Sequence, residues 1–136
     1  MLVGEIMTED VLTVDMDDTL RTVNQIFHKK NFHHLLVVRD KKLTGVISDR
    51  DFIKYVSPFL HSLSEREQDR STLNTKVHQI MSRDPVTVTR ETTVDDASKL
   101  LLKHNISCLP VVTDNGEIKG IVTWKDFLRW SVFFRI

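Results

Sequence analysis

Two short segments of the chain place a hydroxyl group and a carboxylate three residues apart, each just before an apolar run that predicts a helix. Ser48 precedes Asp51 in the first segment, and Thr123 precedes Asp126 in the second. Such a pair can cap the start of a helix, because each side chain accepts a hydrogen bond from a backbone N–H that the helix leaves unused. Alternatively, the hydroxyl can donate to a phosphate oxygen, and the carboxylate can accept from both hydroxyls of a ribose. A single copy of the segment is explained well enough by capping.

A cation stands between the two groups in both segments, as Arg50 and as Lys125. In the first turn of a helix a positive charge opposes the helix dipole. An anion bound nearby would offset that unfavourable interaction. Because the cation recurs in both segments, the pair favours phosphate binding over capping alone.

The two segments belong to a longer internal repeat. Residues 6–8 (Ile-Met-Thr) return 74 positions later as residues 80–82 (Ile-Met-Ser), and Gly45 returns 75 positions later as Gly120. The extra residue falls in a predicted hairpin turn, where an insertion is tolerated. A copy of about 60 residues buries too little surface to be robust alone, so we expect the two copies to pack together. The predicted organisation is a first repeat at 1–57, a linker at 58–75 and a second repeat at 76–136.

Each copy predicts the order strand, helix, strand, strand, helix. The predicted strands are Leu12–Val14, His34–Val38 and Leu43–Ile47 in the first copy and Val86–Val88, Leu109–Val112 and Ile118–Val122 in the second; the first helices are Thr19–Asn31 and Val94–Asn105. Apolar residues three and four positions apart give each helix one buried face. The first helix of each copy is a crossover, so the strands on either side of it should be parallel. The fold class is therefore α/β (α+β), with two pseudo-symmetric β-α-β-β-α units, each a small three-stranded mixed sheet covered by helices.

Composition narrows the classes of function. The 136 residues include 19 basic and 19 acidic ones, and this balance argues against nucleic acid as a partner. No apolar run approaches the roughly 18 residues that a membrane-spanning helix needs, and no targeting segment is evident. Cys108 is the single cysteine, which fits a reducing compartment. We therefore expect a cytoplasmic protein without membrane contact.

Metal, redox and catalytic sites are disfavoured by the same sequence. His33 and His34 are neighbours at the start of a strand, so their side chains should point to opposite faces, and no cysteine or carboxylate stands at ligand spacing. Cys108 fits a small buried hydrophobe better than a reactive thiol. Ser48 lacks an evident general base. We therefore expect no enzyme activity, no catalytic residues and no bound metal.

With these motifs in this order, the chain resembles a tandem pair of cystathionine-β-synthase (CBS) domains, regulatory modules that bind adenosine nucleotides or related adenosyl ligands in two clefts between the copies. The resemblance is carried by the two Gly-hydrophobic-hydrophobic-Ser/Thr-x-x-Asp segments, the Ile-Met-Ser/Thr starts and the strand Cys108–Val112, and it covers nearly the whole chain outside the linker. It implies that the aspartates bind ribose, the hydroxyls and cations bind phosphate, and the strand starts border the base. The implied nucleotide-binding residues are Thr13, Val14, His34, Leu35, Ser48, Arg50 and Asp51 in the first copy and Thr87, Val88, Ser107, Cys108, Leu109, Thr123, Lys125 and Asp126 in the second.

The first copy departs further from the family pattern than the second. Leu36 stands where the second copy has Pro110, and Asp49 stands where it has Trp124. Asp49 adds a negative charge beside the phosphate that the resemblance implies. We therefore expect the second copy to be the better anion-binding site.

The resemblance implies a stand-alone regulatory module that senses AMP, ADP, ATP or S-adenosylmethionine and requires no other cofactor. No output domain is evident outside the two repeats, so regulation is expected to act in trans on an effector protein. The C-terminal segment, residues 130–136, is apolar on more than one side, which suggests packing on the other repeat or a homodimer. Two alternatives stay open, namely a ligand-free structural or dimerisation scaffold, and a metal or redox sensor.

Overall fold

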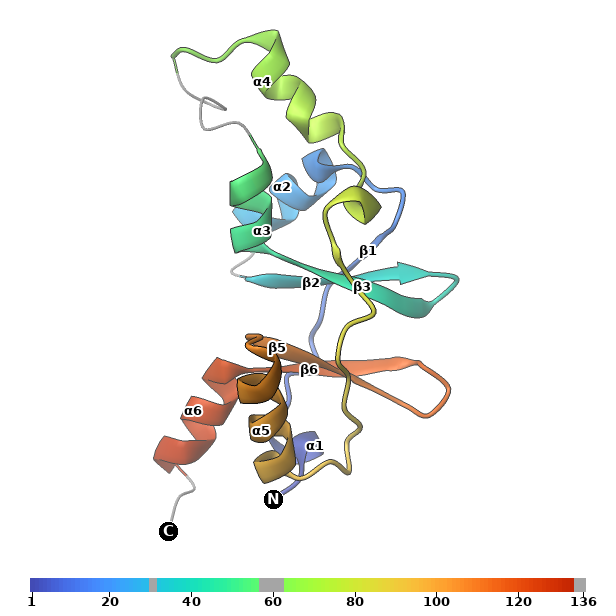
Figure 1. Ribbon diagram of the computed structural model, residues 1–136, viewed down its shortest axis with the longest axis vertical. Helices are drawn as coiled ribbons and strands as arrows, with labels where there is room; N and C mark the ends of the chain where they lie inside the picture. The colour runs from blue at the N-terminus through green and yellow to red at the C-terminus, as the bar shows by residue number, and fades with distance from the viewer. Residues whose placement is uncertain (30–31, 57–62, 134–136) are drawn as a thin grey trace. The chain divides into compact units, whose positions relative to one another are not determined.

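A computed structural model describes residues 1–29, 32–56 and 63–133 of the chain (Figure 1). The end of the first predicted helix at Asn31, the start of the linker and residues 134–136 lie outside the described residues. The elements are α1 (Val3–Ile6), β1 (Thr13–Asp15), α2 (Leu20–Lys29), β2 (His34–Arg39), β3 (Lys42–Ser48), α3 (Asp49–Tyr55), α4 (Glu67–Ser71), η1 (Thr72–Asn74), η2 (Val77–Gln79), β4 (Ser82–Arg83), α5 (Val94–His104), β5 (Cys108–Val112), β6 (Ile118–Thr123) and α6 (Trp124–Phe133), where η denotes a 3₁₀-helix.

The described elements group into two compact units. One, here called the Ser48 unit, comprises Leu12–Asp40 with Thr44–Asp84; the other, the Thr123 unit, comprises Met1–Val11, Lys41–Leu43 and Pro85–Ile136. These units divide the chain at other points than the predicted repeat ranges 1–57 and 76–136. The first segment of each repeat lies in the unit that holds the rest of the other repeat.

The Ser48 unit contains a four-stranded sheet in the order β1-β2-β3-β4. β1 and β2 are parallel, with Thr13 opposite Leu36, as the crossover through α2 requires. β4 pairs antiparallel with β3 and comes from the start of the second repeat. Figure 1 shows α2 and α3 on the same side of β2 and β3. The two helices contact each other through Phe27 and Phe52, whose rings meet edge to face at a centroid distance of 5.8 Å. A mixed sheet covered by helices is thus confirmed for this unit, but it has four strands instead of the predicted three, because the other repeat contributes β4.

The Thr123 unit keeps the same plan with shorter outer strands. β5 and β6 are antiparallel, and Val88 and Thr8 supply the outer positions as single bridges to Val111 and Ile121. The predicted strand Val86–Val88 is therefore too long, and Pro110 accounts for the difference. In the Ser48 unit the N–H of Leu36 donates to the carbonyl oxygen of Leu12 at 3.2 Å, whereas Pro110, at the matching position, has no N–H to donate.

The first segment of each repeat is held by the same three backbone hydrogen bonds. In the Thr123 unit the donors Val3, Gly4 and Val94 bond to Thr92, Arg90 and Met1, at 2.8, 3.0 and 2.9 Å. In the Ser48 unit the donors Val77, His78 and Leu20 bond to Asp18, Met16 and Thr75, at 2.8, 3.1 and 2.9 Å. Each donor and acceptor in one unit lies 74 positions from its counterpart in the other. The pseudo-symmetry of the sequence therefore extends to individual backbone contacts.

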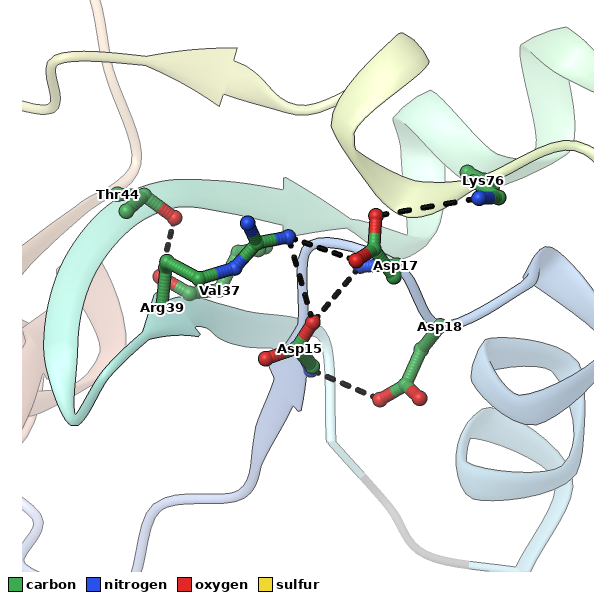
Figure 2. Close-up of polar contacts among 7 residues, drawn as sticks. All are labelled: Asp15, Asp17, Asp18, Val37, Arg39, Thr44 and Lys76. Atoms are coloured by element: carbon green, nitrogen blue, oxygen red, sulfur yellow. Dashed lines mark hydrogen bonds and ion pairs between the residues drawn. The ribbon is translucent and has the colours of Figure 1, made fainter.

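Charged side chains add to this docking in both units, and Figure 2 shows those of the Ser48 unit. Arg39 lies 2.9 Å from an Asp17 carboxylate oxygen and 3.7 Å from Asp15, and Lys76 lies 4.0 Å from Asp17. These side chains are largely exposed, so each pair contributes at most about 1 kcal/mol. In the Thr123 unit the position of Arg39 is held by Thr113, which cannot form an ion pair, and Arg90 lies 3.5 Å from Glu9 instead.

The repeated glycines Gly45 and Gly120 allow the outer strand of each sheet to approach closely. A Cβ atom on Gly120 would lie 2.6 Å from the carbonyl oxygen of Thr8, and one on Gly45 would lie 2.7 Å from that of Ser82. No side chain fits at such a distance without a shift of the neighbouring backbone. The lack of a side chain at the glycine of each repeated motif therefore allows the Ile-Met-Ser/Thr segment to pack closely against the strand.

Candidate functional site

The topology of the Ser48 unit gathers the first-copy residues at one edge of its sheet. β3 ends at Ser48, and the N–H of Asp49 donates to the carbonyl oxygen of His33 at 2.9 Å, so the start of α3 lies beside the start of β2. β1 lies parallel to β2, with Thr13 opposite Leu36. The strand starts and the helix start therefore meet at this edge. The structure places all seven predicted first-copy residues on these elements.

The Ser48–Asp51 pair forms a reciprocal capping box. The N–H of Asp51 donates to Ser48 Oγ at 3.0 Å, and the N–H of Ser48 donates to Asp51 Oδ2 at 3.3 Å. The capping interpretation is thus confirmed for this copy. Among the described residues no donor bonds to Asp51 Oδ1, and the side chain is only half-buried. Asp51 therefore keeps an accessible acceptor while it caps the helix.

Acidic and imidazole groups surround this helix start. His33 Nδ1 lies 2.7 Å from Asp49 Oδ2. Burial lowers the pKa of His34 below its ordinary value of 6.5, and the negative charges of Asp49 and Asp51 oppose that shift in part. Arg50 is exposed. The first-copy site thus carries two carboxylates close to its single arginine.

The Thr123 unit gathers its predicted residues in the same way. The N–H of Trp124 donates to the carbonyl oxygen of Ser107 at 3.1 Å, which matches the Asp49–His33 bond, and Cys108 lies opposite Thr123 in the β5–β6 ladder. Val88 lies beside Val111. Thr87 directly precedes this bridge, and Lys125 stands exposed in the first turn of α6. All eight second-copy residues therefore belong to one compact unit.

Asp126 differs from Asp51 in both burial and bonding. Only 4% of its surface is exposed. Its Oδ2 accepts from the Thr123 N–H at 2.9 Å and from Thr123 Oγ1 at 3.4 Å, and its Oδ1 accepts from Thr8 Oγ1 at 3.2 Å and from Arg129 Nη1 at 3.3 Å. A carboxylate has about four lone-pair positions, so this one is fully used within the protein.

Sequence reasoning missed both Thr8 and Arg129. Arg129 follows Asp126 by three residues, which is a contact distance on a helix and could have been read from the sequence. Thr8 lies 118 residues before Asp126, and no local pattern points to that contact.

Five of the predicted residues are core residues rather than accessible walls. These are Val14, Leu35, Val88, Cys108 and Leu109, all of them buried. Their backbone groups can still face a ligand, but their side chains are buried, with Val14 and Leu35 in the core cluster of one unit and Val88 and Leu109 in that of the other. Burial also raises the pKa of the Cys108 thiol to about 12, so the thiol is protonated and unreactive near neutral pH.

The start of α6 carries an exposed aromatic and cationic surface. Lys125 Nζ lies 5.9 Å from the centroid of the Trp124 ring, within range of a cation–π contact. An open groove along this face is lined by Trp124, Lys125, Leu128, Arg129, Val132 and Phe133. Lys125 and Arg129 therefore flank the groove. The matching positions on α3 are Arg50 and Lys54, so the two helix starts differ in charge by Asp49 in place of Trp124.

Within residues 1–29, 32–56 and 63–133, no three side chains of His, Cys, Asp or Glu come together as a metal-binding group. No helix in these ranges is both long enough and apolar enough to span a membrane.

The comparison with known proteins agrees with the motifs. The family model described as "CBS domain" matches residues 3–58 and again residues 77–132. A CBS domain-containing protein of Dictyostelium discoideum is 35% identical over 94% of this chain and 89% of its own length. Relatives named inosine-5′-monophosphate dehydrogenase also match, but this chain spans only 21–23% of their length. The similarity to those enzymes is therefore confined to a small part of each.

Solved structures of CBS domain pairs share the fold. The CBS domain pair of protein MJ0100, in complex with 5′-methylthioadenosine and S-adenosyl-L-methionine, aligns with a TM-score of 0.81 at 27% identity, over 99% of this chain and 98% of that one. CBSX2 in complex with AMP aligns with a TM-score of 0.79 at 27% identity, over 96% of each chain. Since the family model matches twice and these pairs align over nearly their whole length, the chain belongs to the CBS domain family as a tandem CBS domain pair.

Proposed function

We propose that this chain is a regulatory module that senses an adenosine-containing ligand, namely AMP, ADP, ATP or S-adenosylmethionine. The observation that carries the proposal is Asp51, which caps α3 through one oxygen and leaves the other without a protein donor among the described residues. A half-buried carboxylate with a free acceptor suits the hydroxyls of a ribose. The ligands in the MJ0100 and CBSX2 complexes share an adenosine moiety and support this class of ligand.

The other first-copy residues supply the remaining contacts in this proposal. Ser48 Oγ accepts the Asp51 N–H, so its own proton is available to donate to a phosphate oxygen. Arg50 is exposed beside it and supplies a positive charge. The backbone at Thr13 and His34 borders the base. In the second copy Thr123, Lys125 and Asp126 take the corresponding roles.

The proposal extends to how the ligand is read. A ligand that binds one arrangement of the repeats better than another shifts the population towards it, and a separate effector protein or a second copy of this chain detects the change. Leu128, Val132 and Phe133 on α6 are exposed, which supports association through that helix. We place this signalling in the cytoplasm, with no catalytic step in the chain itself.

Thermal unfolding with each of the four ligands tests the proposal. A ligand at one hundred times its Kd stabilises the folded state by about 2.7 kcal/mol, which is a readily measured shift in Tm. We expect stabilisation by at least one of the four and its loss or marked reduction in Asp51→Ala. Asp114→Ala, which removes an exposed carboxylate from the β5–β6 turn, is the matched control. No stabilisation by any of them at millimolar concentration would support the ligand-free scaffold instead.

A further inference from the structure

Asp126 cannot accept a ribose in its present bonding state. Both of its oxygens already accept two hydrogen bonds each, and the side chain is 4% exposed. The two hydroxyls of a ribose need two acceptor positions, and all four are used, so two of the present donors must leave. The identity of these donors determines what the site can bind.

Two side-chain donors can leave without a change in the backbone: the Thr123 hydroxyl, which reaches Asp126 Oδ2 at 3.4 Å and can rotate, and Arg129. The Thr123 N–H is part of the backbone at the start of α6, and Thr8 is fixed by two backbone hydrogen bonds to Ile121, at 2.8 and 2.9 Å. The Arg129 side chain is 63% exposed and reaches Asp126 through one contact at 3.3 Å. Its guanidinium can therefore move into water without any change in the backbone.

A released Arg129 remains at the groove along α6. Lys125 lies four residues earlier, one turn of the helix away, and both side chains line this groove with Trp124. A guanidinium binds phosphate through two parallel hydrogen bonds, and a second cation beside it strengthens the attraction. An anionic ligand would thus give Arg129 a new partner in place of Asp126, whereas an uncharged nucleoside would not.

We propose that Arg129 is a specificity-determining residue of the second-copy site, which exchanges Asp126 for the phosphate of an adenosine nucleotide. The site then favours nucleotides over the uncharged nucleoside, because only the nucleotide offsets the loss of the Arg129–Asp126 ion pair. This inference rests on the proposed function, in which Asp126 takes the ribose. The first copy offers the comparison, since Lys54 holds the position of Arg129 there and forms no ion pair with Asp51 in the described part of the chain.

Calorimetric titration of the full chain with AMP and with adenosine tests this exchange. Asp51→Ala serves as the background, so that the second-copy site is the one observed. We expect Arg129→Gln to weaken AMP binding and to leave adenosine binding equal or tighter. The Kd for adenosine divided by the Kd for AMP should therefore fall about tenfold, which corresponds to about 1.4 kcal/mol. Lys54→Gln is the matched control and should leave the ratio unchanged.

The possible results separate this inference from the proposed function. If Arg129→Gln weakens the binding of both ligands equally, or changes the binding of neither, the proposed exchange of Asp126 for a phosphate is wrong. The proposed sensing of an adenosine ligand is unaffected by that result. Loss of all binding in Asp51→Ala alone would confine the ligand to the first copy and would also overturn the exchange. If the wild-type chain binds neither compound, the inference is overturned, and thermal unfolding with ADP, ATP and S-adenosylmethionine decides whether the proposed function stands.

Discussion

Asp51 and Asp126 occupy the same position of a duplicated motif, yet they are bonded very differently. Asp51 takes part in a two-bond capping box and keeps one oxygen without a protein donor in the described chain. Asp126 accepts four hydrogen bonds and is 4% exposed. The two extra donors, Thr8 and Arg129, lie outside the repeated motif. A duplicated motif therefore does not ensure two equivalent sites, because neighbouring side chains decide whether its carboxylate is available.

The charges beside the two helix starts favour anion binding in the second copy, although the carboxylate is more available in the first. Asp49 lies at the start of α3 and contacts His33, whereas Trp124 and Lys125 lie at the start of α6. Each helix start carries two cations at matching positions, Arg50 and Lys54 on α3 and Lys125 and Arg129 on α6. The first-copy site thus combines a free carboxylate with the added negative charge of Asp49, whereas the second-copy site combines an occupied carboxylate with the uncharged Trp124. The prediction that the second copy binds anions better gains support from Arg129, but only if the Asp126 ion pair can open.

The largest expected difference between the copies concerns stability. Asp126→Ala removes four hydrogen bonds and leaves the Thr123 N–H and the Thr8 hydroxyl without their partner, which should lower the free energy of unfolding by about 3 kcal/mol. Asp51→Ala removes a helix cap and should cost about 1 kcal/mol. Urea unfolding of both variants measures the difference. Equal losses would contradict the view that Asp126 has the greater structural role.

Much of this arrangement follows from local sequence. The alternation of strands and helices, the parallel pairing across α2 and the Ser48–Asp51 cap all depend on residues close together in the chain, and the structure confirms them. The Thr8–Asp126 contact depends on the first segment docking against the second repeat, 118 residues away. No periodicity reports such a contact, so the bonding state of Asp126 could not be predicted.

The shortened outer strand of the Thr123 unit was predictable in principle. Pro110 is visible in the sequence, and a proline removes a donor from any ladder in which it sits. Which residue of the neighbouring strand loses its hydrogen bond depends on the pairing register, however, and that register is seen only in the structure, where Val88 lies opposite Val111. The residue was evident, whereas its effect needed the structure.

Substitution of the motif glycines should give the next largest effect. In Gly120→Ala the new Cβ would lie 2.6 Å from the Thr8 carbonyl oxygen, so Thr8 must shift and its hydroxyl would move relative to Asp126. In Gly45→Ala the new Cβ would meet the flexible Met81 sulfur and the Ser82 carbonyl oxygen, at 2.6 and 2.7 Å. Overpacking of this kind costs about 2 kcal/mol.

We expect Gly120→Ala to be the more damaging of the two, because it disturbs the Asp126 hydrogen bonds as well as the outer strand. Chemical denaturation provides the measurement, and Gly116→Ala, where a Cβ would contact nothing within 4 Å but the φ of +84° is unfavourable, separates steric from conformational cost. A Gly45→Ala loss as large as that of Gly120→Ala would show that strand docking alone sets the effect.

The smallest expected effect distinguishes the copies by their response to pH. His34 and Cys108 hold matching positions, 74 residues apart. Burial lowers the pKa of His34 below 6.5, with His33 acting in the same direction and Asp49 and Asp51 opposing it, so the unfolded chain binds a proton there more readily than the folded chain. Stability should therefore fall as the pH drops through and below 6.5, and His34→Gln should flatten that part of the curve.

The second copy should show no such slope at its matching position. Burial raises the pKa of Cys108 to about 12, and the thiol carries no charge in either state near pH 6, so Cys108→Ser should leave the shape of the curve unchanged. Urea unfolding at several pH values between about 5 and 8 measures both variants, within the range where an ordinary histidine titrates. If His34→Gln retains the full slope, another histidine is responsible, and the two copies do not differ at this position in the way that their burial and neighbouring charges indicate.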